Sequence, residues 1–262
     1  MSAGEGLRIL GLTVRFGGVT AVSGLNLHAP CGQVTGLIGP NGAGKTTTFN
    51  ACSGLLRPSA GTVQLGGTDV TTQGPARRAR LGMRRTFQRM QLFNRMTVRD
   101  NLVVAHEALL AGTNPLRQVI GGRADRKQIA VAVDSSLRLC GLEDLAGALA
   151  GSLSTGQQRL VDLARACVPG ARLLLLDEPS SGLDRAETEQ FATILRTLVR
   201  ERGVGILLVE HDMSLVMDVC QYLYVLDFGL LVFEGTPEQT RASDVVRAAY
   251  LGSEQGLSTV AS

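Results

Sequence analysis

The amino-acid sequence predicts an α/β fold built around buried parallel strands. Three short segments, residues 34–38, 173–176 and 205–209, are almost entirely apolar, as expected for parallel strands that are covered on both faces. A helical pattern follows each of them, and this alternation of strand and helix is typical of an α/β core. A glycine-rich loop over residues 39–44 joins the first of these strands to its helix.

The front of the chain is predicted to be rich in β-strands. Apolar residues alternate with other residues between positions 10 and 16, which is the period of a half-buried strand. Residues 22–27 and 63–65 repeat a strand-like pattern. The apolar members of the first strand are Leu10, Leu12, Val14 and Phe16.

Residues 97–149 follow a helical period instead. A break over residues 112–126, which contains Gly, Asn, Pro and Arg, separates two helical stretches. We therefore expect a helical lobe inserted between the glycine-rich loop and the strand at 173–176. The small, polar tail at 253–262 is expected to be disordered. Residues at helical spacing are Leu102, Val103, His106, Leu109 and Leu110, and then Ile129, Val133, Leu137 and Cys140.

The glycine-rich loop matches the pattern GxxxxGK[ST]. In this pattern backbone N–H groups turn inward around phosphate oxygens, Lys45 reaches the terminal phosphates and Thr46 offers a hydroxyl to Mg²⁺. The helix beginning near Gly44 adds the positive end of its dipole. A match to this pattern arises by chance in roughly one chain in a hundred of this length, so an ordinary strand-to-helix turn is the less favoured alternative. The apolar residues of the helix are Phe49, Ala51 and Leu55.

Two further segments carry polar groups at the ends of predicted elements. The strand at 173–176 leads into the carboxylates of Asp177 and Glu178, which together with the phosphate loop indicate a nucleoside triphosphate site. Ser154 is a candidate N-cap for a helix over residues 158–167, and a helix N-terminus can bind an anion. Taken alone, an ordinary cap is favoured by about four to one. One face of this helix carries Leu160, Leu163, Ala164 and Cys167.

Composition excludes several classes of function. The net charge is +3, from 26 basic and 23 acidic residues, and only 4% of residues are aromatic, so no nucleic-acid partner is expected. Five scattered cysteines without a CxxC pair favour reduced thiols over disulfides or a zinc site. No apolar stretch approaches the length of a membrane span, so any membrane role is expected to be peripheral.

In this order, the motifs resemble those of the ATP-binding subunits of ABC transporters across essentially the whole chain. Residues 39–46 resemble the Walker A motif, 173–178 the Walker B motif and 181–184 the D-loop. Residues 153–157 are similar to the LSGGQ signature, with Thr155 in place of its first glycine. The remaining matches are Phe16 to the aromatic residue that stacks on adenine, Gln88 to the Q-loop glutamine and His211 to the switch histidine.

The resemblance implies one ABC ATPase domain over residues 7–252, with ATP and Mg²⁺ as cofactors. Its fold would be a P-loop NTPase core with an N-terminal antiparallel β region and an inserted helical subdomain at roughly 97–167. The implied metal-binding residues are Thr46, Gln88 and Asp177, and the implied catalytic residues are Glu178 as general base, His211 and Gln88. Residues implied to bind ATP are Phe16, Gly39, Pro40, Asn41, Gly42, Ala43, Gly44, Lys45, Thr46, Thr47, Ser154, Gly156, Gln157 and Asp184. By contrast, His28 and His106 are expected to be structural.

Finer similarities point to branched-chain amino acid importers, in particular to the longer of their two ATPase subunits, because of an insertion at 110–127. They lie at residues 85–88, 210–213, 224–229, 234–237 and 249–252. The implied partners are a second ATPase subunit in a homo- or heterodimer, transmembrane permease subunits and, indirectly, a periplasmic or extracellular solute-binding protein. The implied location is the cytoplasmic face of the plasma membrane.

One segment is a candidate for contact with the permease, and there are four alternatives to amino-acid import. The apolar residues after Gln88 are expected to dock a permease helix, although burial in the core is favoured in about three such cases in five. Uptake of urea or short amides is the nearest alternative, and lipopolysaccharide export is more distant. A soluble ABC ATPase of DNA repair or translation would usually carry a long coiled coil or two cassettes, and the intact Glu178 argues against a non-hydrolysing module. The docking residues are Met90, Leu92, Phe93 and Met96.

Overall fold

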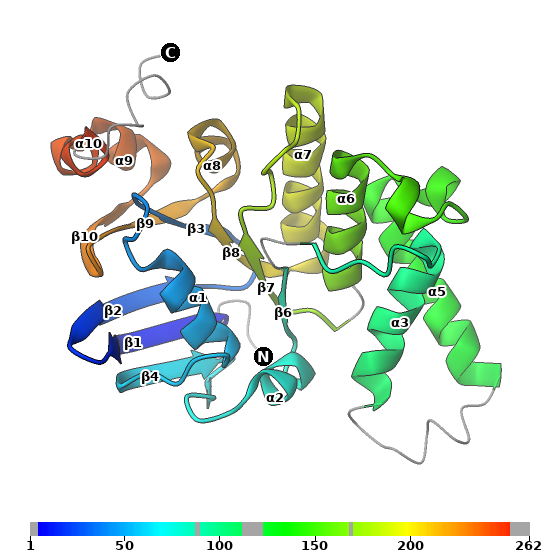
Figure 1. The fold of residues 1–262 in the computed structure, drawn as a ribbon, viewed down its shortest axis with the longest axis horizontal. Helices are drawn as coiled ribbons and strands as arrows, with labels where there is room; N and C mark the ends of the chain where they lie inside the picture. The colour runs from blue at the N-terminus through cyan, green and yellow to red at the C-terminus, as the bar shows by residue number, and fades with distance from the viewer. Residues whose placement is uncertain (1–4, 87–89, 112–122, 168–169, 252–262) are drawn as a thin grey trace.

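The computed structural model describes residues 5–86, 90–111, 123–167 and 170–251, which form two β-sheets and surrounding helices (Figure 1). The strands are β1 (Leu7–Phe16), β2 (Val19–Ala29), β3 (Val34–Ile38), β4 (Ala60–Leu65), β5 (Thr68–Asp69), β6 (Met83–Arg85), β7 (Leu173–Asp177), β8 (Gly205–Val209), β9 (Tyr222–Asp227) and β10 (Leu230–Gly235). The helices are α1 (Lys45–Ser53), α2 (Pro75–Arg80), α3 (Val98–Ala111), α5 (Arg123–Cys140), α6 (Thr155–Ala166), α7 (Arg185–Arg202), α8 (Met213–Val219), α9 (Pro237–Ala242) and α10 (Asp244–Leu251), with 3₁₀ turns η1 (Glu143–Leu145) and η2 (Ala150–Ser152).

The smaller sheet is antiparallel and has the strand order β2-β1-β4-β5. In β1 the predicted alternation is correct for Leu12 and Val14, which are buried, but wrong for Leu10, which is 44% exposed. The reason is a register irregularity around Gly11, whose φ is +60°, because an added residue shifts side chains to the opposite face of a strand. Phe16 ends the strand and is 52% exposed.

The larger sheet has the order β10-β9-β3-β8-β7-β6 and is parallel except for β10. The three predicted apolar strands lie together at its centre and are buried along their whole length. One face packs against α6, α7 and α8, while the other packs against α1 and the smaller sheet (Figure 1). Burial on both faces explains why these segments are continuously apolar rather than alternating.

This strand order determines where the polar loops meet. Because β3, β7 and β8 are parallel neighbours, the loops that leave their carboxyl ends emerge at one edge of the sheet. These loops begin at Gly39, Glu178 and Glu210. Residues that are far apart in the chain are thereby brought to a common edge.

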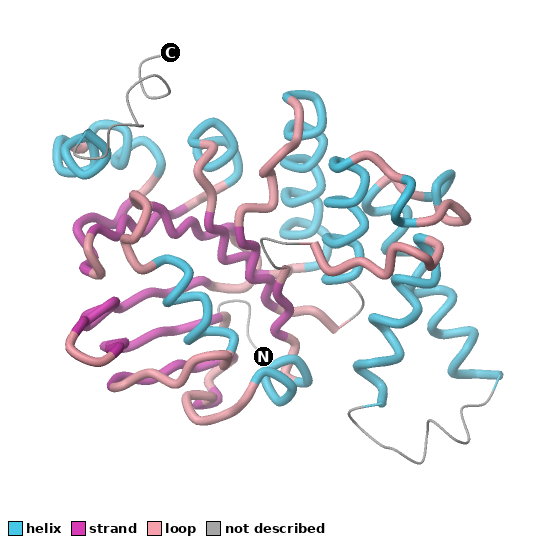
Figure 2. Tube along the Cα trace, in the orientation of Figure 1, coloured by secondary structure: helices cyan, strands magenta, loops and turns pink. Residues whose placement is uncertain are grey.

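The predicted helical lobe is formed by α3, α5 and α6, which pack against one another beside the larger sheet (Figure 2). Ile129, Val133, Leu137 and Cys140 are buried as expected from their spacing. Several boundaries differ from prediction, and α6 begins at Thr155 instead of residue 158 and ends at Ala166 instead of residue 167. Helix α5 already begins at Arg123, inside the expected break, and α1 ends at Ser53, so that Leu55 lies outside it and is 54% exposed.

Helix α1 ends early because Gly54 has a left-handed conformation at its C-cap, which stops a helix.

Both the domain limits at 7–252 and the subdomain limits at about 97–167 remain predictions. Gln88, residues 112–122 of the insertion and the tail at 253–262 lie outside the described residues. Within the described ranges, no helix combines the length and apolar character needed to cross a bilayer.

Candidate nucleotide-binding site

The loop between β3 and α1 is shaped by glycines that no other residue could replace. Gly39 has a φ of +146°, and a Cβ added there would lie 2.0 Å from the carbonyl oxygen of Leu226. Gly44 has a φ of +100°, and its Cβ would lie 2.7 Å from the carbonyl oxygen of Ala21. Helix α1 then begins without a side-chain cap, so its first amides are available to an anion.

Lys45 is the buried cation of this loop. Its side chain folds back so that Nζ donates hydrogen bonds to the carbonyl oxygens of Gly39, at 2.6 Å, and Pro40, at 2.9 Å. Burial lowers the pKa of Lys45, and the nearby carboxylates of Glu178 and Asp177 oppose that change. The ammonium group therefore lies against the loop that would surround a phosphate. Thr46 and Asn41 are exposed, Thr47 is half-buried and Ala43 is buried.

Asp177, at the end of β7, forms a buried ion pair with Arg85 of β6. The distance from Arg85 Nη2 to Asp177 Oδ2 is 3.0 Å, and the two side chains are 8% and 6% exposed. The same guanidinium donates through Nη1 to Asn50 Oδ1 at 2.7 Å and Ser53 Oγ at 3.0 Å, both on α1. Burial raises the pKa of Asp177, whereas Arg85 opposes the rise. Sequence reasoning assigned Arg85 no role in the site, and its only signal in the sequence is the similarity of residues 85–88 to branched-chain amino acid importers.

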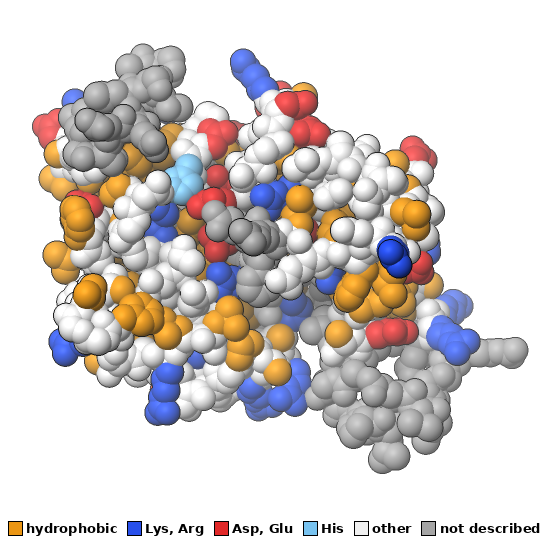
Figure 3. Space-filling model, in the orientation of Figure 1, with side chains coloured by type: hydrophobic (Ala, Val, Ile, Leu, Met, Phe, Trp, Pro, Cys, Tyr) orange, Lys and Arg blue, Asp and Glu red, His pale blue; other side chains and the backbone are white. Residues whose placement is uncertain are grey.

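Glu178 and His211 meet across the loops that follow β7 and β8. His211 Nε2 lies 3.0 Å from Glu178 Oε1, and the side chains are 44% and 21% exposed. Glu178 has a φ of +49°, a left-handed conformation that is unfavourable for a residue with a side chain. Such backbone outliers concentrate at functional sites. On the face drawn in Figure 3, acidic, basic and histidine side chains gather over this edge of the sheet.

Glu210 is a buried carboxylate between these two loops, and sequence reasoning assigned it no role. Only 3% of the residue is exposed. Its Oε1 accepts a hydrogen bond from the backbone N–H of Ser180 at 2.7 Å, and its Oε2 accepts one from the N–H of His211 at 3.0 Å. Burial raises the pKa of Glu210, while hydrogen bonds from Ser180 and from the amides of His211 and Asp212 oppose the rise.

The N-terminus of α6 carries the predicted cap. Ser154 Oγ accepts from the N–H of Gln157 at 3.2 Å, and Gln157 Oε1 accepts from the N–H of Ser154 at 3.0 Å, which makes a complete capping box. Gly156 is buried, and a Cβ added there would lie 2.0 Å from Glu187 Oε1 of α7. Glu187 also forms a capping box with Asp184, the N-cap of α7. A close helix–helix contact therefore requires the glycine.

The structure thus brings together part of the predicted set. Lys45, Asp177, Glu178 and His211 converge at one edge of the sheet, whereas the side-chain hydrogen bonds described for Ser154 and Gln157 join these two residues to each other. Gly156 and Asp184 lie at the contact between α6 and α7. Phe16 lies at the end of the β1–β2 hairpin, whose second strand touches the phosphate loop through Ala21 and Val22. Gln88 lies outside the described residues.

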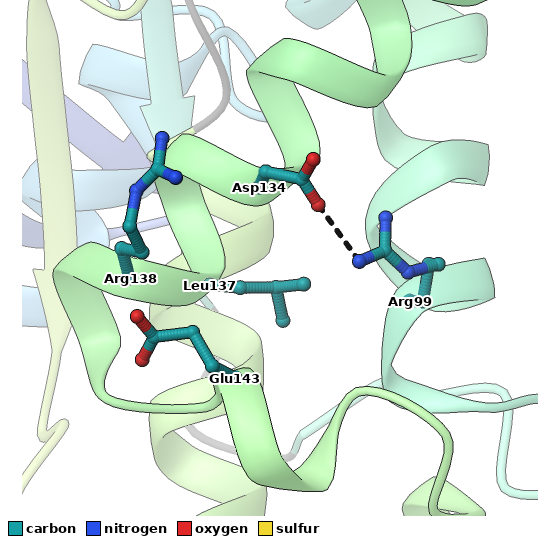
Figure 4. A pocket seen from close by; sticks show the side chains of 5 residues that line it. All are labelled: Arg99, Asp134, Leu137, Arg138 and Glu143. Atoms are coloured by element: carbon teal, nitrogen blue, oxygen red, sulfur yellow. Dashed lines mark hydrogen bonds and ion pairs between the residues drawn. The ribbon is translucent and has the colours of Figure 1, made fainter.

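A separate pocket of about 170 Å³ lies on the helical lobe (Figure 4). Figure 4 shows Arg99 of α3 reaching Asp134 of α5, with Nη2 and Oδ1 2.7 Å apart, beside Leu137, Arg138 and Glu143. Of the residues predicted to bind nucleotide or metal, none of those that the structure describes lines this pocket. The ion pair is about half exposed, so its contribution to stability is small.

The donor set at the sheet edge suits Mg²⁺ held jointly with phosphate. Mg²⁺ prefers oxygen ligands, and it is usually bound by one or two carboxylates together with substrate phosphates. The hydroxyl of Thr46 and the carboxylate of Asp177 supply such donors. Among the described residues, no group of three or more His, Cys, Asp or Glu side chains could hold a metal by itself.

Fold and site together define a P-loop nucleotide-binding protein. Residues 22–181 match the ABC transporter family. The chain therefore belongs to that family, as a cassette that binds and hydrolyses ATP. Its predicted ABC ATPase fold is confirmed by the solved structure of MJ1267, an ATP-binding cassette of an ABC transporter in its ADP conformation, with a TM-score of 0.83 and 29% identity over 95% of this chain and 99% of that one.

Curated relatives cover the chain almost from end to end. The branched-chain amino acid transport ATP-binding protein BraF of Pseudomonas aeruginosa is 41% identical over 249 residues, which are 94% of this chain and 97% of BraF. The corresponding protein LivG of Escherichia coli is 39% identical over 248 residues, with the same coverage of 94% and 97%.

Proposed function

We propose that this chain is the ATP-hydrolysing subunit of an ABC importer for branched-chain amino acids or similar small solutes. The observation that carries the solute class is the 41% identity to BraF over 94% of the chain. Because an ATPase subunit does not contact the transported solute, the solute is inferred by analogy with named relatives, while the ATPase chemistry is argued from the site.

In the proposed mechanism, each polar side chain at the sheet edge has one task. Lys45 leaves the carbonyl oxygens of Gly39 and Pro40 and pairs with the phosphates, because an anion replaces these two acceptors. Glu178 orients the attacking water and accepts its proton, and His211 Nε2 holds the carboxylate in place. Thr46 and Asp177 would hold Mg²⁺, which supplies neutralisation of phosphate charge during hydrolysis.

We also propose that the cassette works as a dimer in which Ser154 and Gly156 contact nucleotide held by a second ATPase subunit. In support, the capping box presents the N-terminus of α6, and both the Ser154 side chain and its neighbour Thr155 are exposed. A helix N-terminus favours an anion, and a γ-phosphate is one. Phe16 would stack on the adenine from the same chain as the phosphate loop, which its exposure permits.

A surface on the helical lobe is the proposed contact with the permease, and we call it the apolar patch. It consists of Phe93, Met96 and Leu149, which are 46%, 39% and 50% exposed. Residues 94–97 and 149–151 are joined by backbone hydrogen bonds and an isolated β-bridge, so the patch belongs to one structural unit. Leu92 instead packs against the core. Docking to the permease requires exposed side chains, and of the four predicted docking residues only Phe93 and Met96 are exposed, because Met90 is half-buried.

Arg165 connects this patch to α6. Its Nη1 donates to the carbonyl oxygen of Gln91 at 2.5 Å, and its guanidinium lies 5.5 Å from the centre of the Phe93 ring. A movement of α6 on nucleotide binding would thus be passed to the patch.

Replacing Phe93 with Asp should abolish transport and spare ATP binding, whereas Leu230→Asp, at an apolar position on β10 that is 52% exposed, should transport normally. Normal transport by folded Phe93→Asp would place the permease elsewhere.

Uptake measurements test the proposed solute. Deleting the gene and measuring uptake of radiolabelled leucine, isoleucine, valine and urea should show loss of the three amino acids with urea unchanged. Loss of urea uptake alone would assign the chain to the alternative system, and unchanged uptake of all four in a strain without a redundant importer would contradict both. The proposed location is the cytoplasmic face of the plasma membrane, so the chain should associate with membranes only when the permease subunits are present. The proposed solute-binding protein lies on the opposite side of the membrane.

A further inference from the structure

Glu210 joins two loops of the hydrolysis site, and its two oxygens have different partners. Oε1 accepts from the amide of Ser180, two residues after Glu178, and Oε2 accepts from the amide of His211. The carboxylate is buried in the fold at the end of β8. A buried carboxylate that accepts backbone N–H bonds from both loops, with a further contribution from the amide of Asp212, is a strong and directional link, because charge-assisted hydrogen bonds are about twice as strong as neutral ones.

The Glu210 carboxylate lies next to the loops that carry Glu178 and His211, but it is not itself one of the reacting groups. At the level of the strands, the amide of Glu178 donates to the carbonyl oxygen of Val209 at 2.9 Å. Beyond the strands, Glu210 joins the same two loops a second time, through Ser180. Glu178 is thus enclosed between two connections to β8 and the loop after it, and its left-handed backbone needs such support.

We propose that Glu210 is a positioning residue for ATP hydrolysis. By accepting hydrogen bonds from the amides of Ser180 and His211, it keeps His211 Nε2 at 3.0 Å from Glu178 Oε1. The arrangement requires a carboxylate, because both partners are donors. A glutamine of the same shape replaces one acceptor oxygen with a donor NH₂ group, which then faces a backbone N–H that is itself a donor. This inference rests on the proposed roles of Glu178 and His211.

Glu210→Gln tests the proposal, with Glu201→Gln as the matched control on an exposed part of α7. Expected is a fall in kcat of roughly 10- to 100-fold, from the loss of one charge-assisted hydrogen bond next to the base. KM and the ATP dissociation constant should stay within about twofold, because Lys45 and its loop belong to β3 and α1. Hydrolysis is normalised to the ATP-binding fraction measured by titration, so partial unfolding cannot imitate the result.

A double-mutant cycle with His211→Ala separates positioning from a purely structural role. If Glu210 acts through the placement of His211, the two losses in kcat are not independent. The fold-loss in kcat of the double variant should then be at least about threefold smaller than the product of the two single fold-losses. Three results would each overturn the proposal. These are a double variant whose loss equals the product of the single losses, a kcat of Glu210→Gln equal to that of Glu201→Gln, and a change confined to KM. Absence of hydrolysis by the unmodified, assembled protein would instead contradict the proposed function itself, so the two failures are distinguishable.

Discussion

Replacing Arg85 with Met should destabilise the protein strongly, because it leaves the buried carboxylate of Asp177 without its partner. The pair is 3.0 Å apart with side chains 8% and 6% exposed, so solvent cannot take over the role of the guanidinium. Removing one partner of a buried ion pair typically costs about 3–5 kcal/mol. Arg85 also donates to Asn50 and Ser53 of α1, and losing these bonds adds to the cost.

The assay is chemical denaturation in the absence of nucleotide and Mg²⁺, with Arg185→Met as control. Arg185 pairs with Glu189 at 3.2 Å, but its side chain is 94% exposed, so the control is expected to change stability little. Adding Asp177→Asn to Arg85→Met should recover part of the loss, because no buried charge then remains unpaired. A cost for Arg85→Met below about 1 kcal/mol, or a double variant less stable than the single one, would refute the reasoning.

Three further predictions concern hydrolysis, assembly and pH. Glu178→Gln should retain ATP binding and lose about 10²–10⁴-fold in hydrolysis rate, so a variant above about half the normal rate would remove Glu178 from the role of base. Mixed dimers of Lys45→Ala and Ser154→Arg chains should keep at most one working site; full activity of a demonstrably monomeric chain would contradict the arrangement in trans. Burial raises the pKa of Asp162 to about 6, so its charge opposes folding above pH 6 and this cost disappears as the pH falls toward 4. Asp162→Asn should therefore stabilise the protein at pH 7.5 by up to roughly 3 kcal/mol and at pH 4.5 by much less, as measured by thermal unfolding.

Local chemistry made several parts of this protein predictable from sequence. The apolar runs that became β3, β7 and β8 were recognisable because burial on both faces leaves no polar position. The Ser154 cap was recognisable because its partner, Gln157, lies within one helical turn. Where a single residue altered the local geometry, as Gly11 does in β1 and Gly54 does after α1, periodicity failed for Leu10 and Leu55.

The phosphate loop was predictable from the sequence alone, because its glycines, Lys45 and Thr46 are contiguous and act through local backbone geometry. Which side chains lie opposite one another at the sheet edge depends on the arrangement of the strands in the folded domain. Strand order places β8 between β3 and β7, and so sets His211 against Glu178, 33 residues away, and Glu210 against Ser180. Periodicity reports whether a strand is buried but not which strand lies beside it, since neighbours are chosen by packing of the whole domain.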